Sequence, residues 1–252
     1  MPGKAFSGVR GAAVLLVTVI HLLTGFLWVG GTACLHREAG RRAAARWCRG
    51  LLRLFGIRIE AAGTPQRGAL LAANHLSWLD IVVLYTLVPE TFLSKEEVRR
   101  WPVVGPVAVC LGTLFIGRGH SGAAERATAA MAGRLARGET VVFFPEGRIA
   151  HGPGILPFRP RLLRAAHEAG AVIQPVAVDY RGHFKDGLGY IVPERSLAHS
   201  VWWAACRPPT ARVHFLPPLE ANGQARRRLA EEARQRIADA LGRPVVGRTP
   251  LA

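Results

Sequence analysis

The pair of residues in this sequence best suited to acid–base chemistry is His75 and Asp80. Asn74 and His75 end an apolar run that predicts a buried strand. Ser77 is a good N-cap for the helix that follows, whose first turn carries Asp80. A loop here can fold His75 back over that turn, so that the carboxylate holds one imidazole nitrogen while the other takes a proton. With no side-chain nucleophile beside the pair, this pattern predicts a general base acting on a substrate hydroxyl. Taken alone, the spacing also fits a loop histidine next to a helix-start residue.

Three other strand-like runs carry residues of interest. Arg118 ends a run bracketed by glycines, and the planar fork of an arginine suits a phosphate. Another run leads into Glu146, Gly147 and Arg148. There glycine permits a tight turn, and the carboxylate can bond a substrate hydroxyl or pair with an arginine. Pro175 interrupts a further run and indicates an edge or a bulge, because proline cannot donate to the ladder. Each feature alone also fits an ordinary turn or surface position.

Short apolar runs alternate with helical patterns from Ile57 onward, which predicts an α/β sandwich around a largely parallel sheet. In such sheets ligands bind just past the strand ends, where the residues above lie. We assign no structure to 180–209. The predicted strands are Arg58–Ala61, Ala69–Ala73, Thr91–Leu93, Leu114–Ile116, Val141–Phe144, Val172–Val178 and Val213–Leu216, and the predicted helices are Trp78–Leu87, Ala123–Arg137, Arg161–Ala169 and Ala225–Leu241.

The segment 11–35 contains no Lys, Arg, Asp or Glu, and its length suits a membrane-spanning helix. A cleaved signal peptide would have a shorter apolar stretch and a small-residue cleavage site, so we expect a retained anchor. A helix that enters the bilayer without crossing it is the alternative. Six arginines lie between 37 and 53, against Lys4 and Arg10 before the segment, which predicts that the bulk of the protein is cytoplasmic.

The arginines after this segment follow a helical pattern. Arg42, Arg46, Arg49 and Arg53 share one face, and apolar residues including Trp47 lie opposite. The pattern predicts an amphipathic helix in the interface of an anionic membrane. A helix packed on the domain with a solvated arginine face is the alternative.

The net charge of +16 favours anionic partners such as nucleic acid, lipid headgroups or acidic carriers. A nucleic-acid binder is disfavoured, because no aromatic residues are interleaved with the basic ones and no reading motif is present. The four cysteines form no C-x-x-C pair, the histidines no H-E-x-x-H motif, and the sequence has no Gly-Lys-Ser/Thr phosphate loop. We therefore expect no bound metal or redox cofactor.

In their order and separation, these motifs resemble those of the glycerolipid acyltransferase family, which includes 1-acyl-sn-glycerol-3-phosphate acyltransferases. The resemblance covers about 51–216. The sequence departs from the family at Gly117, where many members have an acid, and at Arg148, which comes one position early. The matches are Asn74, His75 and Asp80 to N-H-x-x-x-x-D, Arg118 to the arginine that binds the acceptor phosphate, Phe144 to Gly147 to F-P-E-G, Pro175 to a strand proline, and Phe158-Arg159 to a downstream F-K.

The resemblance implies transfer of an acyl group from acyl-CoA or acyl carrier protein to a lysophospholipid, first of all 1-acyl-sn-glycerol 3-phosphate, giving phosphatidic acid. His75 would be the base and Asp80 its orienting partner, while Arg118, Glu146, Gly147 and Arg148 would hold the acceptor. A lyso-ornithine or other lyso-aminolipid acceptor is the alternative, for which the departures leave room. Outside this class stand an inactive membrane scaffold and a basic nucleic-acid-binding protein.

The expected organisation has four parts. An N-terminal membrane anchor spans 1–36 and a basic interfacial helix 37–56, followed by the catalytic domain over 57–245 and a tail over 246–252. We expect membrane lipids and the acyl donor to be the partners.

Overall fold

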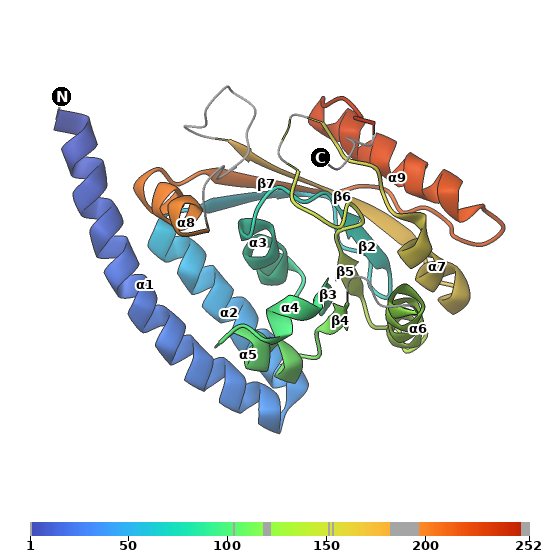
Figure 1. Ribbon diagram of the computed structural model, residues 1–252, viewed down its shortest axis with the longest axis horizontal. Coiled ribbons are helices and arrows are strands. Elements are labelled where there is room, and N and C mark those ends of the chain that lie inside the picture. The colour runs from blue at the N-terminus through green and yellow to red at the C-terminus, as the bar shows by residue number, and fades with distance from the viewer. Residues whose placement is uncertain are drawn as a thin grey trace. The chain divides into compact units, whose positions relative to one another are not determined.

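The computed structural model describes residues 2–102, 104–117, 122–150, 152, 154–181 and 197–247. Helices and strands alternate along most of the chain after the first two helices (Figure 1). The helices are α1 (Pro2–Leu35), α2 (Arg37–Phe55), α3 (Leu79–Leu87), α4 (Glu96–Arg99), α5 (Val104–Cys110), α6 (Ala123–Leu135), α7 (Pro160–Ala169), α8 (Leu197–Cys206) and α9 (Arg226–Leu241). The strands are β1 (Arg58–Ala62), β2 (Leu70–Ala73), β3 (Thr91–Lys95), β4 (Leu114–Ile116), β5 (Val141–Phe143), β6 (Ile173–Arg181) and β7 (Thr210–Phe215).

The strands form a seven-stranded sheet in the order β1-β7-β6-β2-β5-β3-β4. Strand β2 pairs in parallel with β5 and β6, and β3 pairs in parallel with β4 and β5. In this register Leu70 lies opposite both Val141 and Ile173. Strands β2 and β5 are entirely buried, which is why they are continuous apolar runs rather than alternating ones. The predicted α/β fold with a mostly parallel sheet is confirmed.

The chain divides into two compact units. The first, here called the helical unit, contains Met1–Glu60, Leu76–Pro89 and Asp179–Arg212. The second, the sheet unit, contains Ala61–His75, Glu90–Val178 and Val213–Ala252. Within the helical unit, α1 packs against α2 and α8, and α2 packs against α3.

The core of the sheet unit lies between the strands and the helices α6, α7 and α9, which pack together in the order α6–α7–α9 (Figure 1). Leu70 and Phe143 from the strands meet Met131, Leu163 and Ile237 from these helices. All five side chains are at most 1% exposed. The strand ends therefore extend from a rigid, close-packed base.

Helix α1 contains the 25-residue segment Gly11–Leu35, which has a mean hydropathy of 2.3 and is long and apolar enough to cross a membrane. Only 17% of its most apolar window is buried within the protein. Its one strongly polar residue, His21, is held by α2. The ring Nε2 lies 3.0 Å from the Trp47 carbonyl oxygen, and the indole Nε1 donates to the His21 carbonyl at 2.9 Å. The two rings also stack. One ring nitrogen and the carbonyl of this histidine thus have partners within the protein.

Helix α2 buries its small and apolar side chains, among them Cys48, Leu51 and Phe55, within the helical unit. Its predicted arginine face, Arg42, Arg46, Arg49 and Arg53, is exposed. Because α1 and α3 cover the apolar side, α2 presents arginines rather than apolar groups to its surroundings.

The sequence predicted an edge or a bulge at Pro175, and the edge is wrong because Pro175 lies in an interior strand. Strand β6 lies between β7 and β2. The carbonyl of Pro175 accepts from the Leu216 N–H at 3.0 Å, and the Gln174 side-chain amide donates to the Leu216 carbonyl, also at 3.0 Å. Because this amide replaces the N–H that proline lacks, the sheet accepts a proline in its interior. The chain beside Pro175 is nevertheless irregular, since Ile173 pairs with Leu219 instead of continuing the same register.

Candidate active site

His75 follows β2, a central strand, and its backbone is held on both sides within the sheet unit. Its N–H donates to Glu146 Oε1 at 2.9 Å, and its carbonyl accepts from the Ala150 N–H at 2.8 Å. The imidazole stacks on Phe144, with ring centroids 4.0 Å apart and planes 19° from parallel. The segment after β5 thus fixes the histidine through one carboxylate, one peptide group and one aromatic ring.

Asn74 ties the start of this loop to β6. Its Nδ2 donates to the Val178 carbonyl at 3.0 Å, and its Oδ1 accepts from the Val178 N–H at 2.7 Å. The side chain is fully buried. The amide therefore continues the β2–β6 pairing beyond the last residue of β2, and it holds His75 at the sheet's carboxyl edge.

The turn after β5 needs its glycine. Gly147 has φ +70°, and its N–H donates to the Phe144 carbonyl at 3.0 Å. A Cβ on Gly147 would lie 2.8 Å from the guanidinium carbon of Arg159, so the flexible Arg159 side chain would have to shift, and the positive φ itself favours glycine. Glu146 is 4% exposed, so its carboxylate faces inward towards the His75 loop. Arg148, the next residue in the turn, is partly exposed.

Asp80 lies in the helical unit, fully buried in the first turn of α3. Its Oδ2 accepts from the Leu76 N–H at 2.6 Å and from the Ser77 N–H at 2.9 Å. Ser77 Oγ in turn accepts from the Leu79 N–H at 3.0 Å. The bond from the Ser77 N–H to Asp80 is the acidic half of a capping box, but Ser77 Oγ binds the Leu79 N–H instead of the Asp80 N–H. The predicted N-cap at Ser77 is wrong, because α3 begins at Leu79 and its N-cap residue is Trp78.

The second carboxylate oxygen of Asp80 accepts from the hydroxyl of Tyr180 at 2.5 Å. Burial, together with the negative charge of Asp80, raises the pKa of the Tyr180 phenol well above its usual range. The phenol therefore keeps its proton and remains a donor. The bonds from Leu76, Ser77 and Tyr180 hold the buried carboxyl group of Asp80 in one orientation.

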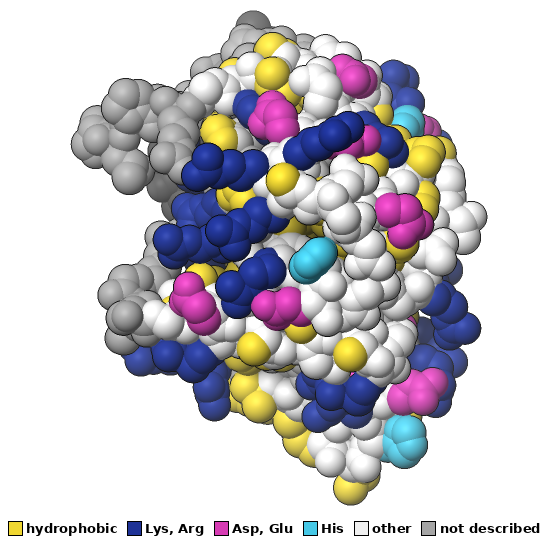
Figure 2. Space-filling model, turned by 90° about the vertical axis from the view of Figure 1, so that its right-hand side faces the viewer, with side chains coloured by type: hydrophobic (Ala, Val, Ile, Leu, Met, Phe, Trp, Pro, Cys, Tyr) yellow, Lys and Arg dark blue, Asp and Glu magenta, His cyan; other side chains and the backbone are white. Residues whose placement is uncertain are grey.

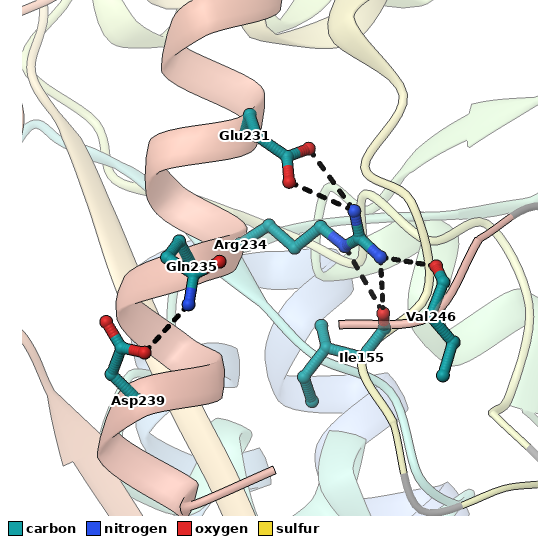
Figure 3. Close-up of polar contacts among 6 residues, drawn as sticks. All are labelled: Ile155, Glu231, Arg234, Gln235, Asp239 and Val246. Atoms are coloured by element: carbon teal, nitrogen blue, oxygen red, sulfur yellow. Dashed lines mark hydrogen bonds and ion pairs between the residues drawn. The ribbon is translucent and has the colours of Figure 1, made fainter. Parts of the chain in front are cut away.

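The segment after the Glu146 turn is anchored by Arg234 of α9 (Figure 3). The guanidinium donates to the Ile155 carbonyl at 3.0 and 3.2 Å, to the Val246 carbonyl, and to Glu231 at 3.1 Å. Ile155 and Val245 form a parallel bridge beside it. We call this group of contacts the Arg234 clasp. The Arg234 clasp fixes this loop at Ile155, and Glu146, near the start of the same loop, binds the His75 N–H.

The predicted site residues have different positions. Asn74, His75, Glu146, Gly147 and Arg148 come together at the ends of β2 and β5 in the sheet unit. Of the other three, Asp80 belongs to the helical unit, Pro175 lies within β6, and Arg118 lies outside the described residues. The expected bond between Asp80 and the imidazole stays a prediction.

Sequence reasoning missed Tyr180 and the role of Phe144. Tyr180 is 100 residues from its partner, and nothing near it in the sequence signals the bond. Its position near the carboxyl end of β6 is a signal that could have found it.

Chemically, the sheet unit provides a half-buried imidazole on a loop held by Glu146, Ala150 and Phe144, and the helical unit contains the buried carboxylate of Asp80. Such a set can move a proton and stabilise a transient imidazolium. Among the described residues, no group of three His, Cys, Asp or Glu side chains is placed to hold a metal ion.

Known proteins with similar sequence and fold are acyltransferases. A family model described as Acyltransferase matches residues 57–179. A lyso-ornithine lipid O-acyltransferase of Pseudomonas aeruginosa is 38% identical over 78% of this chain and 76% of its own. A 1-acyl-sn-glycerol-3-phosphate acyltransferase of Neisseria meningitidis is 40% identical over 57% of each chain. The crystal structure of the 1-acyl-sn-glycerophosphate acyltransferase PlsC from Thermotoga maritima has a TM-score of 0.71 at 19% identity, covering 95% of this chain and 98% of that one.

The mostly parallel sheet with its flanking helices is thus the fold of an α/β acyltransferase. The chain belongs to the acyltransferase family of lipid-acylating enzymes. Membership in this family and the apolar helix α1 together point to association with a membrane.

Proposed function

We propose that this protein transfers a fatty acyl group from a thioester donor to the hydroxyl of a single-chain membrane lipid, with His75 as general base. The observation that carries the proposal is the fixation of His75 by Glu146, Ala150 and Phe144. A base held this rigidly at the carboxyl end of a central strand is suited to proton transfer. The buried carboxyl group of Asp80 accepts hydrogen bonds from Leu76, Ser77 and Tyr180. A group held in this way is suited to orient the imidazole and to stabilise its charged form.

In the proposed reaction, His75 takes the proton of the acceptor hydroxyl as its oxygen attacks the thioester carbonyl. The tetrahedral intermediate then collapses, the C–S bond breaks, and the imidazolium returns the proton to the leaving thiolate. The products are an ester and a free thiol, CoA or carrier protein. General base catalysis of this kind contributes about 10²–10⁴-fold in rate. Arg118, Glu146, Gly147 and Arg148 would hold the acceptor.

Two acceptors have support. A lyso-ornithine lipid is favoured by the breadth of the match to the P. aeruginosa enzyme, and Gly117, where many members of the family have an acid, leaves room for that acceptor. A 1-acyl-sn-glycerol 3-phosphate is favoured by the 40% identity to the N. meningitidis enzyme. In both cases the acylated group is a single hydroxyl of a one-chain lipid, so one mechanism serves both.

The proposal includes a membrane arrangement. Helix α1 anchors the chain, the exposed arginines of α2 lie near anionic headgroups, and the catalytic domain over 57–245 faces the cytoplasm. Each basic residue close to such a surface contributes about 1 kcal/mol to binding. The arginines that follow α1 support this orientation.

The test is thiol release by detergent-purified protein, with acyl-CoA or acyl carrier protein as donor and lyso-ornithine lipid or lysophosphatidic acid as acceptor. We expect turnover that His75→Ala lowers at least a hundredfold. His167→Ala, which alters an exposed histidine of α7, should match the wild type. The acceptor that gives the higher kcat/KM identifies the substrate. A folded His75→Ala protein with near-full activity would refute the mechanism, and no turnover with any donor–acceptor pair would refute the function.

A further inference from the structure

A cavity of about 210 Å³ lies among the helices α6, α7 and α9 of the sheet unit. Figure 2 shows the side of the molecule on which these helices lie in Figure 1, and Lys and Arg side chains gather there. The lining residues are Ala124, Glu125 and Thr128 of α6, Arg161 and Arg164 of α7, and Arg226 of α9. The His75 loop contributes none of them.

The lining brings three guanidinium groups together against one carboxylate, Glu125. Arg164 is ion-paired with Glu168 at 2.8 Å. In the part of the chain that the structure describes, neither Arg161 nor Arg226 has an ion pair. Like charges held close together repel, and an anion between them removes that repulsion. Arginine forks bind phosphate oxygens in pairs, which makes phosphate the best-fitting anion.

The cavity lies close to the turn that holds His75. The N–H of Arg159 donates to the Pro145 carbonyl at 3.0 Å, and α7 begins at the next residue. A helix rises about 1.5 Å per residue, so Arg164 is only about 8 Å further along the axis. An extended phosphopantetheine arm, with two amide units joined by methylenes, spans on the order of 15 Å at peptide-like bond lengths. Such an arm can bridge the distance from this cavity to the turn.

We propose that this cavity binds the phosphate end of the acyl donor, a phosphopantetheine thioester. The proposal rests on the proposed function, which places the thioester beside His75. The acceptor's headgroup lies only a few bonds from its reacting hydroxyl and must therefore stay near the imidazole. The donor's phosphate lies at the far end of a long arm and needs a separate site. Both CoA and carrier protein present this phosphate.

The kinetic test uses the double variant Arg161→Ala/Arg226→Ala, with Arg227→Ala as the matched control. Arg227 is an exposed neighbour on α9 that does not line the cavity. We expect the donor KM of the double variant to rise about tenfold or more, as loss of charge-assisted bonds to phosphate requires. Its kcat and acceptor KM should stay within twofold. A rise in acceptor KM alone would overturn the proposal, as would an equal effect of Arg227→Ala.

Binding measured by calorimetry separates this proposal from the proposed function, because it needs no turnover. The probes are CoA and holo carrier protein without an acyl group. We expect the double variant to bind one or both at least tenfold more weakly than the wild type. A loss confined to CoA identifies its nucleotide phosphates as the occupant, and a loss with carrier protein identifies the phosphopantetheine phosphate. Equal binding by variant and wild type would overturn the proposal. Binding that depends on the arginines in a protein without transferase activity would refute only the proposed function.

Discussion

Tyr180→Phe removes a single hydroxyl from the surroundings of Asp80 and leaves the aromatic ring in place. The carboxylate then keeps two donors, the N–H groups of Leu76 and Ser77, and loses the shortest bond of the three, at 2.5 Å. A hydrogen bond to a charged group contributes about 1.5–3 kcal/mol. We expect the variant to lose about 2 kcal/mol of stability, which at about 2–4 °C per kcal/mol lowers Tm by about 4–8 °C.

Activity should fall further than stability explains. In the proposed mechanism Asp80 orients the imidazole, and with one carboxylate oxygen released it can rotate and orient the ring less well. On that mechanism we expect kcat to drop about tenfold while both substrate KM values stay within twofold. Steady-state thiol release at a temperature well below Tm measures this. Tyr85→Phe, the same change at another buried tyrosine of the helical unit, is the comparison. If Tyr180→Phe loses stability but keeps the wild-type kcat, the orienting role of Asp80 is refuted.

Tyr180→Phe should also change how the stability of the protein falls at alkaline pH. Because burial raises the pKa of Tyr180, the folded state keeps a proton that the unfolded state releases near pH 10. The contribution of Tyr180 to stability is therefore present below about pH 10 and is lost as the pH rises above it. Denaturant unfolding at pH 9 and pH 11 should show a smaller loss for Tyr180→Phe than for the wild type. Equal losses would mean that the phenol is not held in its neutral form.

Three further predictions concern other groups. Glu146→Leu removes the acceptor of the His75 N–H, so kcat should fall at least tenfold. Glu146→Gln keeps a carbonyl acceptor and should retain more activity. Stopped thiol-release assays compare the two variants. Burial raises the pKa of the Cys48 thiol to about 12, so maleimide should label this thiol far more slowly in the folded protein than in urea. Peptide mass mapping measures the labelling rate, and equal rates in the two states would contradict the burial of Cys48. Arg234→Gln should cost about 3 kcal/mol and speed amide exchange at 154–156. Arg236→Gln, which alters a half-exposed ion pair, should cost under about 1 kcal/mol. Unchanged exchange in Arg234→Gln would contradict a role for the Arg234 clasp.

The sequence predicted most of the sheet because parallel, doubly buried strands are continuous apolar runs. The predicted strand Leu114–Ile116 matches β4, and Val141–Phe144 exceeds β5 by one residue. Helices α4, α5 and α8 were missed. Helix α8 lies in the stretch without an assigned structure and has no amphipathic pattern, because apolar residues cover most of its surface.

The hydrogen bonds of the candidate site were harder to predict from the sequence than the residues that form the site. His75 and Glu146 were recognised by type, but the bond between the His75 peptide N–H and the Glu146 carboxylate joins residues 71 apart and involves a backbone atom. Local pattern does not encode such a bond. The same holds for Arg234, which has the sequence signature of an exposed helix residue but is buried because two carbonyl groups converge on it.

Gln174 and Pro175 together determine the alignment of the chain beside β6. Gln174 Oε1 accepts from the Gln66 N–H at 2.7 Å, and its Nε2 donates to Thr64 and Leu216, both at 3.0 Å. A slip of one residue would place another carbonyl opposite the proline and move Leu216 away from its substitute donor. Since a shift in register would break all of these hydrogen bonds together, Gln174 and Pro175 favour a single register. Pro175 interrupts the hydrogen-bond ladder of the sheet, and the same residue thus helps to prevent the strands from pairing in a wrong register.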